Sequence, residues 1–136
     1  MAPVADTYIA DTVALARYLE DSLPRAADAT FSRAEAGKAT MLVPEIVIAE
    51  FVYIALKGRL EVPEPRSTVM EVLGDVAASR HLKQVGVPAG AWPAFVESKI
   101  SELHDRIIHA TASFYKAEAI ITNDRELVAS GYPTIW

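Results

Sequence analysis

The stretch TYIADTVALARYL, residues 7–19, decides the fold class, because its periodicity changes at one acidic residue. Residues 7–10 are apolar, aromatic or β-branched, which is typical of a short strand. After Asp11-Thr12 the apolar residues follow a helical stripe, formed by Val13, Leu15, Ala16, Tyr18 and Leu19. We therefore predict a strand, an acid and then a helix that closes near Pro24.

The same alternation continues along the chain. Further strands are predicted at 39–43, 82–85, 119–122 and 133–136, and further helices at 26–36, 44–57, 66–79, 92–100, 102–115 and 125–129. Gly37 and Gly58 mark two helix ends, and Pro44 is read as the first residue of its helix. Alternating strands and helices predict an α/β fold, a three-layer α/β/α sandwich with a central mostly parallel sheet. We expect residues 1–136 to form one domain.

The amino-acid composition excludes several kinds of functional site. The 136 residues include no cysteine, which excludes disulfides, a thiolate nucleophile and any zinc site built on sulfur. The N-terminus has neither a basic start nor an apolar run typical of a signal peptide, and no segment is long enough to span a membrane, so we expect a cytoplasmic protein. The net charge of −5 argues only weakly against a nucleic-acid partner, because four acids in one metal site would leave the rest of the surface nearly neutral.

The predicted helix at 44–57 is apolar nearly all the way round. Its apolar residues are Ile46, Val47, Ile48, Phe51, Val52, Ile54, Ala55 and Leu56. One buried face cannot hold all of these side chains, so we expect a lid, a partner or a second subunit to cover another side of this helix.

Two acids follow predicted strands directly. Asp11 ends the first strand, and Asp124 follows the strand at 119–122. In open parallel sheets the functional residues gather beyond the carboxyl ends of the strands, so both positions are informative. The alternative is that each aspartate only caps the helix that follows it.

Glu50 emerges from the apolar stripe of its helix. Its neighbours one turn away are apolar or aromatic, and a glutamate in such surroundings needs a partner, a metal ion or a proton. The alternative is a buried salt bridge, for example with Arg17. Glu45 is expected on the solvent-exposed side of the same helix.

The fourth acid, Asp105, lies in the segment HDRIIHATA at 104–112, where Ala110 and Ala112 would let a helix pack closely on the sheet. The alternative is an ordinary first-turn acid favoured by the helix dipole. His109, one turn later, could orient Asp105 or reach a metal, but it is more often a structural hydrogen-bonding residue. His81 and His104 are expected at the surface.

Four carboxylates that converge without cations repel one another, and such a cluster is tolerable mainly when it holds a hard divalent metal. Oxygen ligands suit Mg²⁺ or Mn²⁺. These ions accept phosphate oxygens as further ligands, so the pattern predicts phosphodiester hydrolysis by a nuclease.

These residues resemble the PIN domain family, and within it the VapC-type ribonuclease toxins. The resemblance spans residues 8–136 and rests on the order Asp, Glu, Asp, Asp, separated by 39, 55 and 19 positions. Its anchors are YIADT at 8–12, VP at 43–44 with AEF at 49–51, KGRL at 57–60, DRIIHATA at 105–112, ITND at 121–124 and the closing Ile135-Trp136.

The resemblance implies an acidic metal pocket formed by Asp11, Glu50, Asp105 and Asp124, with Thr12 and Thr122 hydrogen-bonding the carboxylates and Asn123 as a further supporting residue. It also implies endonuclease activity on RNA that depends on Mg²⁺ or Mn²⁺, homodimerisation, and inhibition by a small antitoxin that buries an apolar segment in a groove. Toxin activity in a type II toxin-antitoxin pair is the expected role.

The chain departs from the family pattern at three places. Val13 stands where many relatives have a small polar residue, and His109 occupies a position that is often small. The segment SELH at 101–104 replaces an Asp-Pro pair, with Glu102 as a candidate substitute. Two alternatives stay open: a receiver-like signalling domain, which would need a second acid beside Asp11 and a late lysine, and a non-catalytic PIN-like binding module.

Overall fold

The computed structural model describes residues 6–136, and their strands form one parallel five-stranded sheet. The strand order is β3-β2-β1-β4-β5. The elements are β1 (Asp6–Ala10), α1 (Thr12–Leu19), α2 (Arg25–Glu35), β2 (Ala39–Pro44), α3 (Glu45–Leu56), α4 (Pro65–Ala78), β3 (Leu82–Val85), the 3₁₀ helix η1 (Ala89–Ala91), α5 (Trp92–Glu97), α6 (Leu103–Tyr115), β4 (Ala119–Ile121), α7 (Arg125–Ala129) and β5 (Thr134–Ile135).

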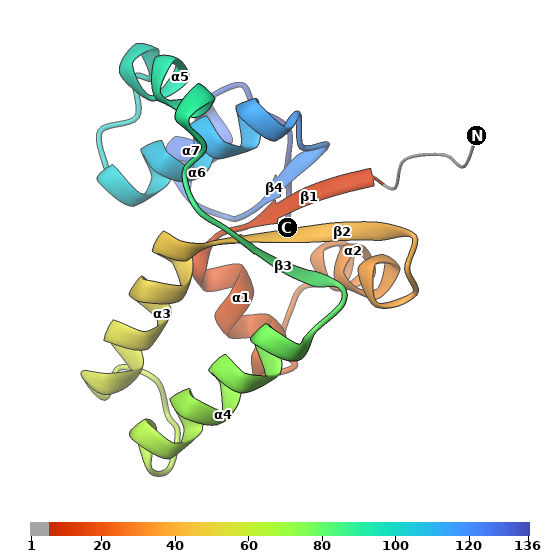
Figure 1. Cartoon of the computed structure of the whole chain (residues 1–136), viewed down its shortest axis with the longest axis vertical. Helices are drawn as coiled ribbons and strands as arrows, with labels where there is room; N and C mark the ends of the chain where they lie inside the picture. Colours follow the sequence, from red (N-terminus) through yellow and green to blue (C-terminus); the bar gives the residue numbers. More distant parts are fainter. Residues whose placement is uncertain (1–5) are drawn as a thin grey trace.

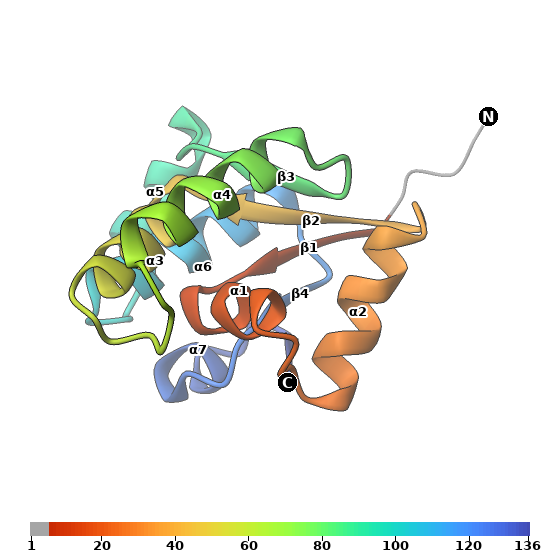
Figure 2. The same cartoon turned by 90° about the horizontal axis from the view of Figure 1, so that it is seen from below.

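The helices form layers on both faces of the sheet, which confirms the predicted α/β/α sandwich (Figure 1). On one side α1 contacts α2 and α3, and α3 contacts α4. On the other side α6 packs on β1 and β4 and is covered by η1 and α5. The view from below shows β1 at the centre between β2 and β4 (Figure 2). The segment at 7–19 therefore builds the middle of the sheet.

The core is dense where α6 crosses the central strands. Ile9, Ile120 and Ile121 are fully buried, as is Ile108 of α6. Ala110 and Ala112 are also completely buried, in agreement with the prediction that small residues let this helix approach the sheet. This packing fixes the start of α6, and with it Asp105, relative to the ends of β1 and β4.

Two predicted boundaries are wrong. Pro44 is the last residue of β2, paired with Val85, because its φ of −61° suits both strand and helix while its ψ of 145° is extended. The helix predicted at 92–100 stops at Glu97. Ser98 leaves the helical conformation with a ψ of 142°, and its hydroxyl accepts a hydrogen bond from the Ile100 N–H (3.2 Å). Residues 98–100 instead form an extended connection to α6.

The apolar helix α3 is covered on a second side, as predicted, and the cover is α4 of the same chain. Tyr53 and Leu56 still remain more than half exposed, at 58% and 52%. Within residues 6–136, no helix combines the length and the apolar character needed to cross a membrane.

Candidate functional site

All four predicted acids line one pocket at the carboxyl edge of the sheet. The pocket has a volume of about 320 Å³. Its lining residues are Asp11, Thr12, Val13, Glu50, Glu102, Asp105, Asn123 and Asp124. Asp11 follows β1, Asp124 follows β4, Glu50 comes from α3 and Asp105 from the first turn of α6. The parallel sheet thus brings together residues that lie up to 113 positions apart in the chain.

Asp11 is buried, and its two oxygens have separate partners. Oδ1 caps α1 by accepting a hydrogen bond from the Ala14 N–H (2.8 Å), and Oδ2 accepts one from the Thr122 hydroxyl. Burial raises the pKa of Asp11 to about 6, against the lowering effect of these two hydrogen bonds, and the charges of Asp124 and Glu50 raise it further. Capping is therefore only part of what this carboxyl group does in the fold.

Asp124 and Asp105 lie close together in the pocket. Asp124 Oδ1 caps α7 by accepting from the N–H groups of Glu126 (3.0 Å) and Leu127 (3.2 Å). Burial raises the pKa of Asp105 to about 7, and the neighbouring charges of Asp124, Glu102 and Asp11 add to the effect. The three aspartates are therefore close enough to repel one another in the absence of a cation.

Glu50 is held by a residue that the sequence analysis placed at the surface. His104 Nδ1 lies 2.9 Å from Glu50 Oε2 and 2.8 Å from Glu102 Oε1. The side chain of His104 is 36% exposed, so it lies at the rim of the pocket rather than in free solvent. The proposed Glu50–Arg17 salt bridge is wrong, since Arg17 stacks over the Trp136 ring at 5.5 Å.

Glu102 takes the place predicted for a substitute acid, but both of its oxygens are engaged. Oε2 caps α6 by accepting from the Asp105 N–H (2.7 Å), while Oε1 bonds to His104. Although partial burial raises the pKa of Glu102, the hydrogen bonds from Asp105 and His104 outweigh it and lower the pKa. Both contacts are local to the start of α6, and only the further contact of His104 with Glu50 requires α3 and α6 to come together.

The predicted supporting residues differ in their contacts. The Thr122 hydroxyl donates to Asp11 and accepts from the Asp124 N–H (3.0 Å), so it links two of the acids. Thr12 and Asn123 line the pocket, but neither side chain hydrogen-bonds a carboxylate within the described part of the chain. Val13 also lines the pocket and is 45% exposed, so it does not belong to the buried stripe of α1.

The donor set can be tested against the divalent metal that the carboxylates imply. Within residues 6–136, no three His, Asp or Glu side chains converge closely enough to surround an ion as they stand. The oxygen-only donors and the raised pKa values of Asp11 and Asp105 nevertheless fit a site whose negative charge a hard cation would neutralise. Glu50, the fourth carboxylate of the pocket, contacts His104.

Removing the Thr122 hydroxyl tests this part of the site. Thr122→Val should destabilise the protein by about 1–2 kcal/mol, because the Asp124 N–H and Asp11 Oδ2 lose their common partner. Urea unfolding would measure the loss. Thr122→Ser, which keeps the hydroxyl, and Thr111→Val, whose hydroxyl only bonds the Ile107 carbonyl within α6, should each cost less. Equal losses for the two valine variants would contradict the linking role.

His81 was also expected at the surface, and this is wrong. It is half-buried, and its Nε2 lies 2.9 Å from the Tyr18 hydroxyl while Nδ1 lies 3.1 Å from the Ser79 hydroxyl. Tyr18 donates a further hydrogen bond to Glu35 (2.7 Å). This network ties α1, α2 and the start of β3 together at a distance from the acidic pocket.

Several solved structures share this fold. Over most of its length the chain resembles VapBC2 from Rickettsia felis, solved bound to a promoter DNA fragment, with a TM-score of 0.69, 15% identity, and 95% of this chain and 97% of that chain covered. The chain is also similar to VapC20 of Mycobacterium tuberculosis, described as a sarcin-ricin loop cleaving toxin. The TM-score is 0.62 and the sequence identity 18%, with 92% of this chain and 95% of that chain covered. A toxin-antitoxin complex from Klebsiella pneumoniae matches with a TM-score of 0.61 and 21% sequence identity, with 95% of this chain and 96% of that chain covered.

The search of curated protein sequences found no match. At these identities the solved structures establish a shared fold, and they include VapC toxins. The sequence itself matches the model of the PIN domain over residues 8–130, a span that holds all four acids. The resemblance identified from the sequence motifs is thereby confirmed, and the chain belongs to the PIN domain family.

Proposed function

We propose that the protein is a metal-dependent endoribonuclease that hydrolyses RNA phosphodiester bonds and serves as the toxin of a type II toxin-antitoxin pair. The observation that carries this proposal is the single pocket shared by Asp11, Glu50, Asp105 and Asp124, four carboxylates from three helix starts and one apolar helix. The fold shared with VapC toxins supports the same conclusion. Family membership argues against the receiver-like alternative.

Asp11, Asp105, Asp124 and Glu50 would hold Mg²⁺ or Mn²⁺. When bound, such an ion supplies an activated water molecule and neutralises charge on the phosphate. The chain's own residues orient the carboxylates: Ala14, Glu126 and Leu127 fix the Oδ1 atoms of two aspartates with their N–H groups, and Thr122 fixes Asp11 Oδ2. His104 contacts Glu50 at the rim of the pocket.

The experiment is cleavage of labelled RNA by the purified protein with Mn²⁺ or Mg²⁺, and after chelation with EDTA. Cleavage should require the ion, and Glu50→Gln should lower its rate at least about tenfold, because an amide is a weaker ligand for a hard cation. Glu45→Gln is the matched control, since Glu45 lies exposed on the same helix outside the acidic pocket.

Metal-independent cleavage would contradict the proposal, as would equal activity of the Glu50 and Glu45 variants. If the unmutated protein cleaves no RNA under any of these conditions, the remaining alternative is a non-catalytic PIN-like binding module. That module would still use the same surface to hold a partner.

An antitoxin partner is proposed for the surface next to the acidic pocket. A hollow of about 460 Å³ is lined by Ala49, Glu50, Tyr53, Ile54, Arg59 and His104. It offers the half-exposed Tyr53 ring beside the cationic Arg59, and it shares Glu50 with the acidic pocket. A segment seated there would therefore also reach the site, as inhibition requires. The toxin-antitoxin complexes among the similar structures support this partner.

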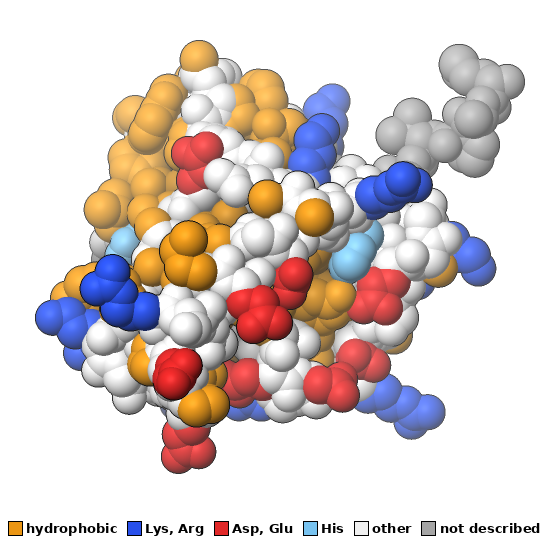
Figure 3. All heavy atoms as spheres, turned by 60° about the horizontal axis from the view of Figure 1, so that its bottom comes forward, with side chains coloured by type: hydrophobic (Ala, Val, Ile, Leu, Met, Phe, Trp, Pro, Cys, Tyr) orange, Lys and Arg blue, Asp and Glu red, His pale blue; other side chains and the backbone are white. Residues whose placement is uncertain are grey.

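Homodimerisation is proposed for an exposed apolar surface on α5 and the end of α6. Trp92 and Val96 of α5 are 46% and 70% exposed, and Phe114 of α6 is 45% exposed. In the space-filling view, hydrophobic side chains gather at the upper left, at the end of the molecule that carries α5 (Figure 3). An apolar surface of this kind is typical of subunit contacts.

A further inference from the structure

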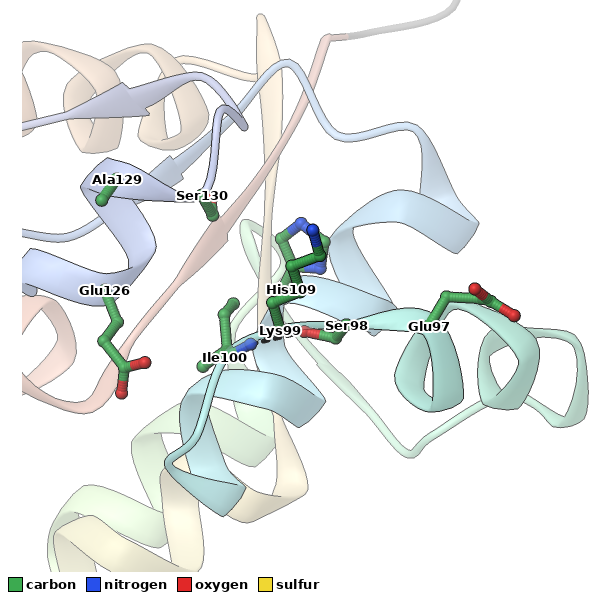
Figure 4. A pocket seen from close by; sticks show the side chains of 8 residues that line it. All are labelled: Glu97, Ser98, Lys99, Ile100, His109, Glu126, Ala129 and Ser130. Atoms are coloured by element: carbon green, nitrogen blue, oxygen red, sulfur yellow. Dashed lines mark hydrogen bonds between the residues drawn. The ribbon is translucent and has the colours of Figure 1, made fainter.

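A second cavity lies beside the acidic pocket and has no role in the proposed reaction. Its volume is about 410 Å³. Ser98, Lys99 and Ile100 form one wall, His109 of α6 lies in the middle, and Ala129 and Ser130 at the end of α7 form the other side (Figure 4). The wall at 98–100 exists because α5 stops at Glu97, which is the boundary that periodicity failed to predict.

His109 brings unused hydrogen-bonding capacity to this cavity. Its Nδ1 is buried and has no hydrogen-bond partner among residues 6–136. The ring is held edge to face against Tyr132, with centroids 5.7 Å apart and an interplanar angle of 78°. Burial lowers the pKa of His109, which favours the neutral imidazole with one donor and one acceptor nitrogen. Rotating the His109 ring by half a turn about its bond to Cβ would exchange the positions of Nδ1 and Cδ2.

Three of the other polar side chains around the cavity, those of Glu126, Ser98 and Ser130, already have partners, whereas Glu97 and Lys99 are exposed to solvent. Glu126 accepts hydrogen bonds from the Ser101 hydroxyl (2.7 Å) and N–H (3.0 Å), and the Ser98 hydroxyl accepts from Ile100. The Ser130 hydroxyl donates to the Leu127 carbonyl and accepts from the Tyr132 N–H (3.3 Å). His109 is therefore the group in this cavity with most to gain from a ligand.

The cavity adjoins the acidic pocket along two elements. His109 lies one helical turn, about 5.4 Å, beyond Asp105 on the same face of α6. Glu126 lies two residues after Asp124. An RNA strand with one phosphate at the four acids would thus have a neighbouring nucleotide within reach of His109.

We propose that this cavity is a subsite for a nucleobase of the RNA strand, and that His109 is the residue that reads the edge of the base. The inference rests on the proposed function. One nitrogen of a neutral imidazole can donate or accept a single hydrogen bond at a base edge, according to its tautomer, and Ile100 and Ala129 supply apolar contact. A phosphate is disfavoured, because the cavity is lined by two carboxylates, those of Glu97 and Glu126, against the single ammonium of Lys99.

Binding to the metal-free protein tests this without any need for cleavage. The chain has three histidines, so the ring signals of His109, His104 and His81 can be followed separately by NMR in EDTA. We expect at least one of the four nucleoside 5′-monophosphates, at up to about 10 mM, to shift the His109 signals, a range that includes weak millimolar binding. His81, which lies far from the cavity, should not respond, and inorganic phosphate should leave His109 unchanged.

Ala129→Met should fill the cavity and weaken nucleotide binding at least about tenfold, whereas Ala77→Met, at an exposed position on α4, should not. His109→Phe keeps the ring against Tyr132 and removes both nitrogens, so its binding, measured by equilibrium dialysis, should also fall.

The subsite is refuted if no nucleotide moves the His109 signals, or if Ala129→Met binds as the unmutated protein does. A cavity that responds only to an apolar peptide belongs to a protein partner and equally refutes it. RNA cleavage without nucleotide binding at His109 would leave the proposed function intact, whereas binding without cleavage would refute the ribonuclease and keep the nucleotide site.

Discussion

Asp11→Asn is expected to reduce RNA cleavage on the order of 10³-fold while leaving the metal-free protein at least as stable as the unmutated one. Asp11 is only 4% exposed and forms no ion pair with a basic side chain among residues 6–136, and burial raises its pKa to about 6. The amide oxygen of asparagine can still accept from the Ala14 N–H and cap α1. The substitution therefore removes a charge that the fold tolerates poorly, and leaves the cap in place.

Two measurements on one preparation separate function from folding: the cleavage rate with Mn²⁺, and the melting temperature in EDTA at pH 8. Asp75→Asn is the control, because Asp75 lies exposed on α4 outside the acidic pocket. It should change neither quantity appreciably. Normal cleavage by the Asp11→Asn variant would show that Asp11 is not a catalytic residue. A large drop in melting temperature would mean that the carboxylate stabilises the fold rather than serving the site.

The opposed interpretations of Asp11 and Asp124, helix cap or site residue, turn out to be compatible in geometry. Each aspartate uses Oδ1 for its cap, Asp11 Oδ2 accepts from the Thr122 hydroxyl, and both residues line the acidic pocket. A strand that ends in an aspartate can therefore start its helix and supply a carboxylate at the sheet edge with the same residue. This explains why position after a strand was sufficient to predict where both residues lie.

Glu50 could be predicted for a different reason: a charged residue in an apolar helix face needs a partner. The same reasoning could not identify that partner. His104 reaches Glu50 only because α6 crosses next to α3, a tertiary contact between residues 54 positions apart. Periodicity likewise failed at residues 98–100, where a Ser98 hydroxyl bond replaces a helical one, and at Val13, which the helical stripe assigned to the core.

The stability of the metal-free protein should fall as the pH rises from 6 to 8. The pKa values of Asp11 and Asp105 are about 6 and about 7 in the fold, whereas an aspartate in the unfolded chain titrates near 4. In this range the native state retains protons that the unfolded chain has released, so the free energy of unfolding decreases with pH. The penalty is absent below about pH 4 and complete above about pH 8, and between pH 6 and 8 we expect a loss on the order of 2 kcal/mol.

Two other groups, His109 and Glu102, also contribute to the pH dependence of stability. Burial lowers the pKa of His109, so the unfolded chain takes up a proton below about pH 6.5 and the histidine opposes the carboxylates there. The pKa of Glu102 is lowered by its hydrogen bonds, and it acts only in more acidic solution. Asp105→Asn provides the comparison, because it leaves His109 in place. Its stability should depend less on pH than that of the unmutated protein, measured by calorimetry in EDTA.

Mn²⁺ should reverse the sign of this pH dependence. The ion binds the ionised carboxylates and competes with protons for them, so its affinity rises over the same interval in which the metal-free fold weakens. At 100 times the dissociation constant, binding stabilises the native state by about 2.7 kcal/mol, more than the penalty it removes. We therefore expect a melting temperature that falls from pH 6 to 8 in EDTA and rises in millimolar Mn²⁺, with both slopes reduced in Asp105→Asn. Parallel slopes with and without Mn²⁺ would show that the raised pKa values belong to a cluster that binds no metal.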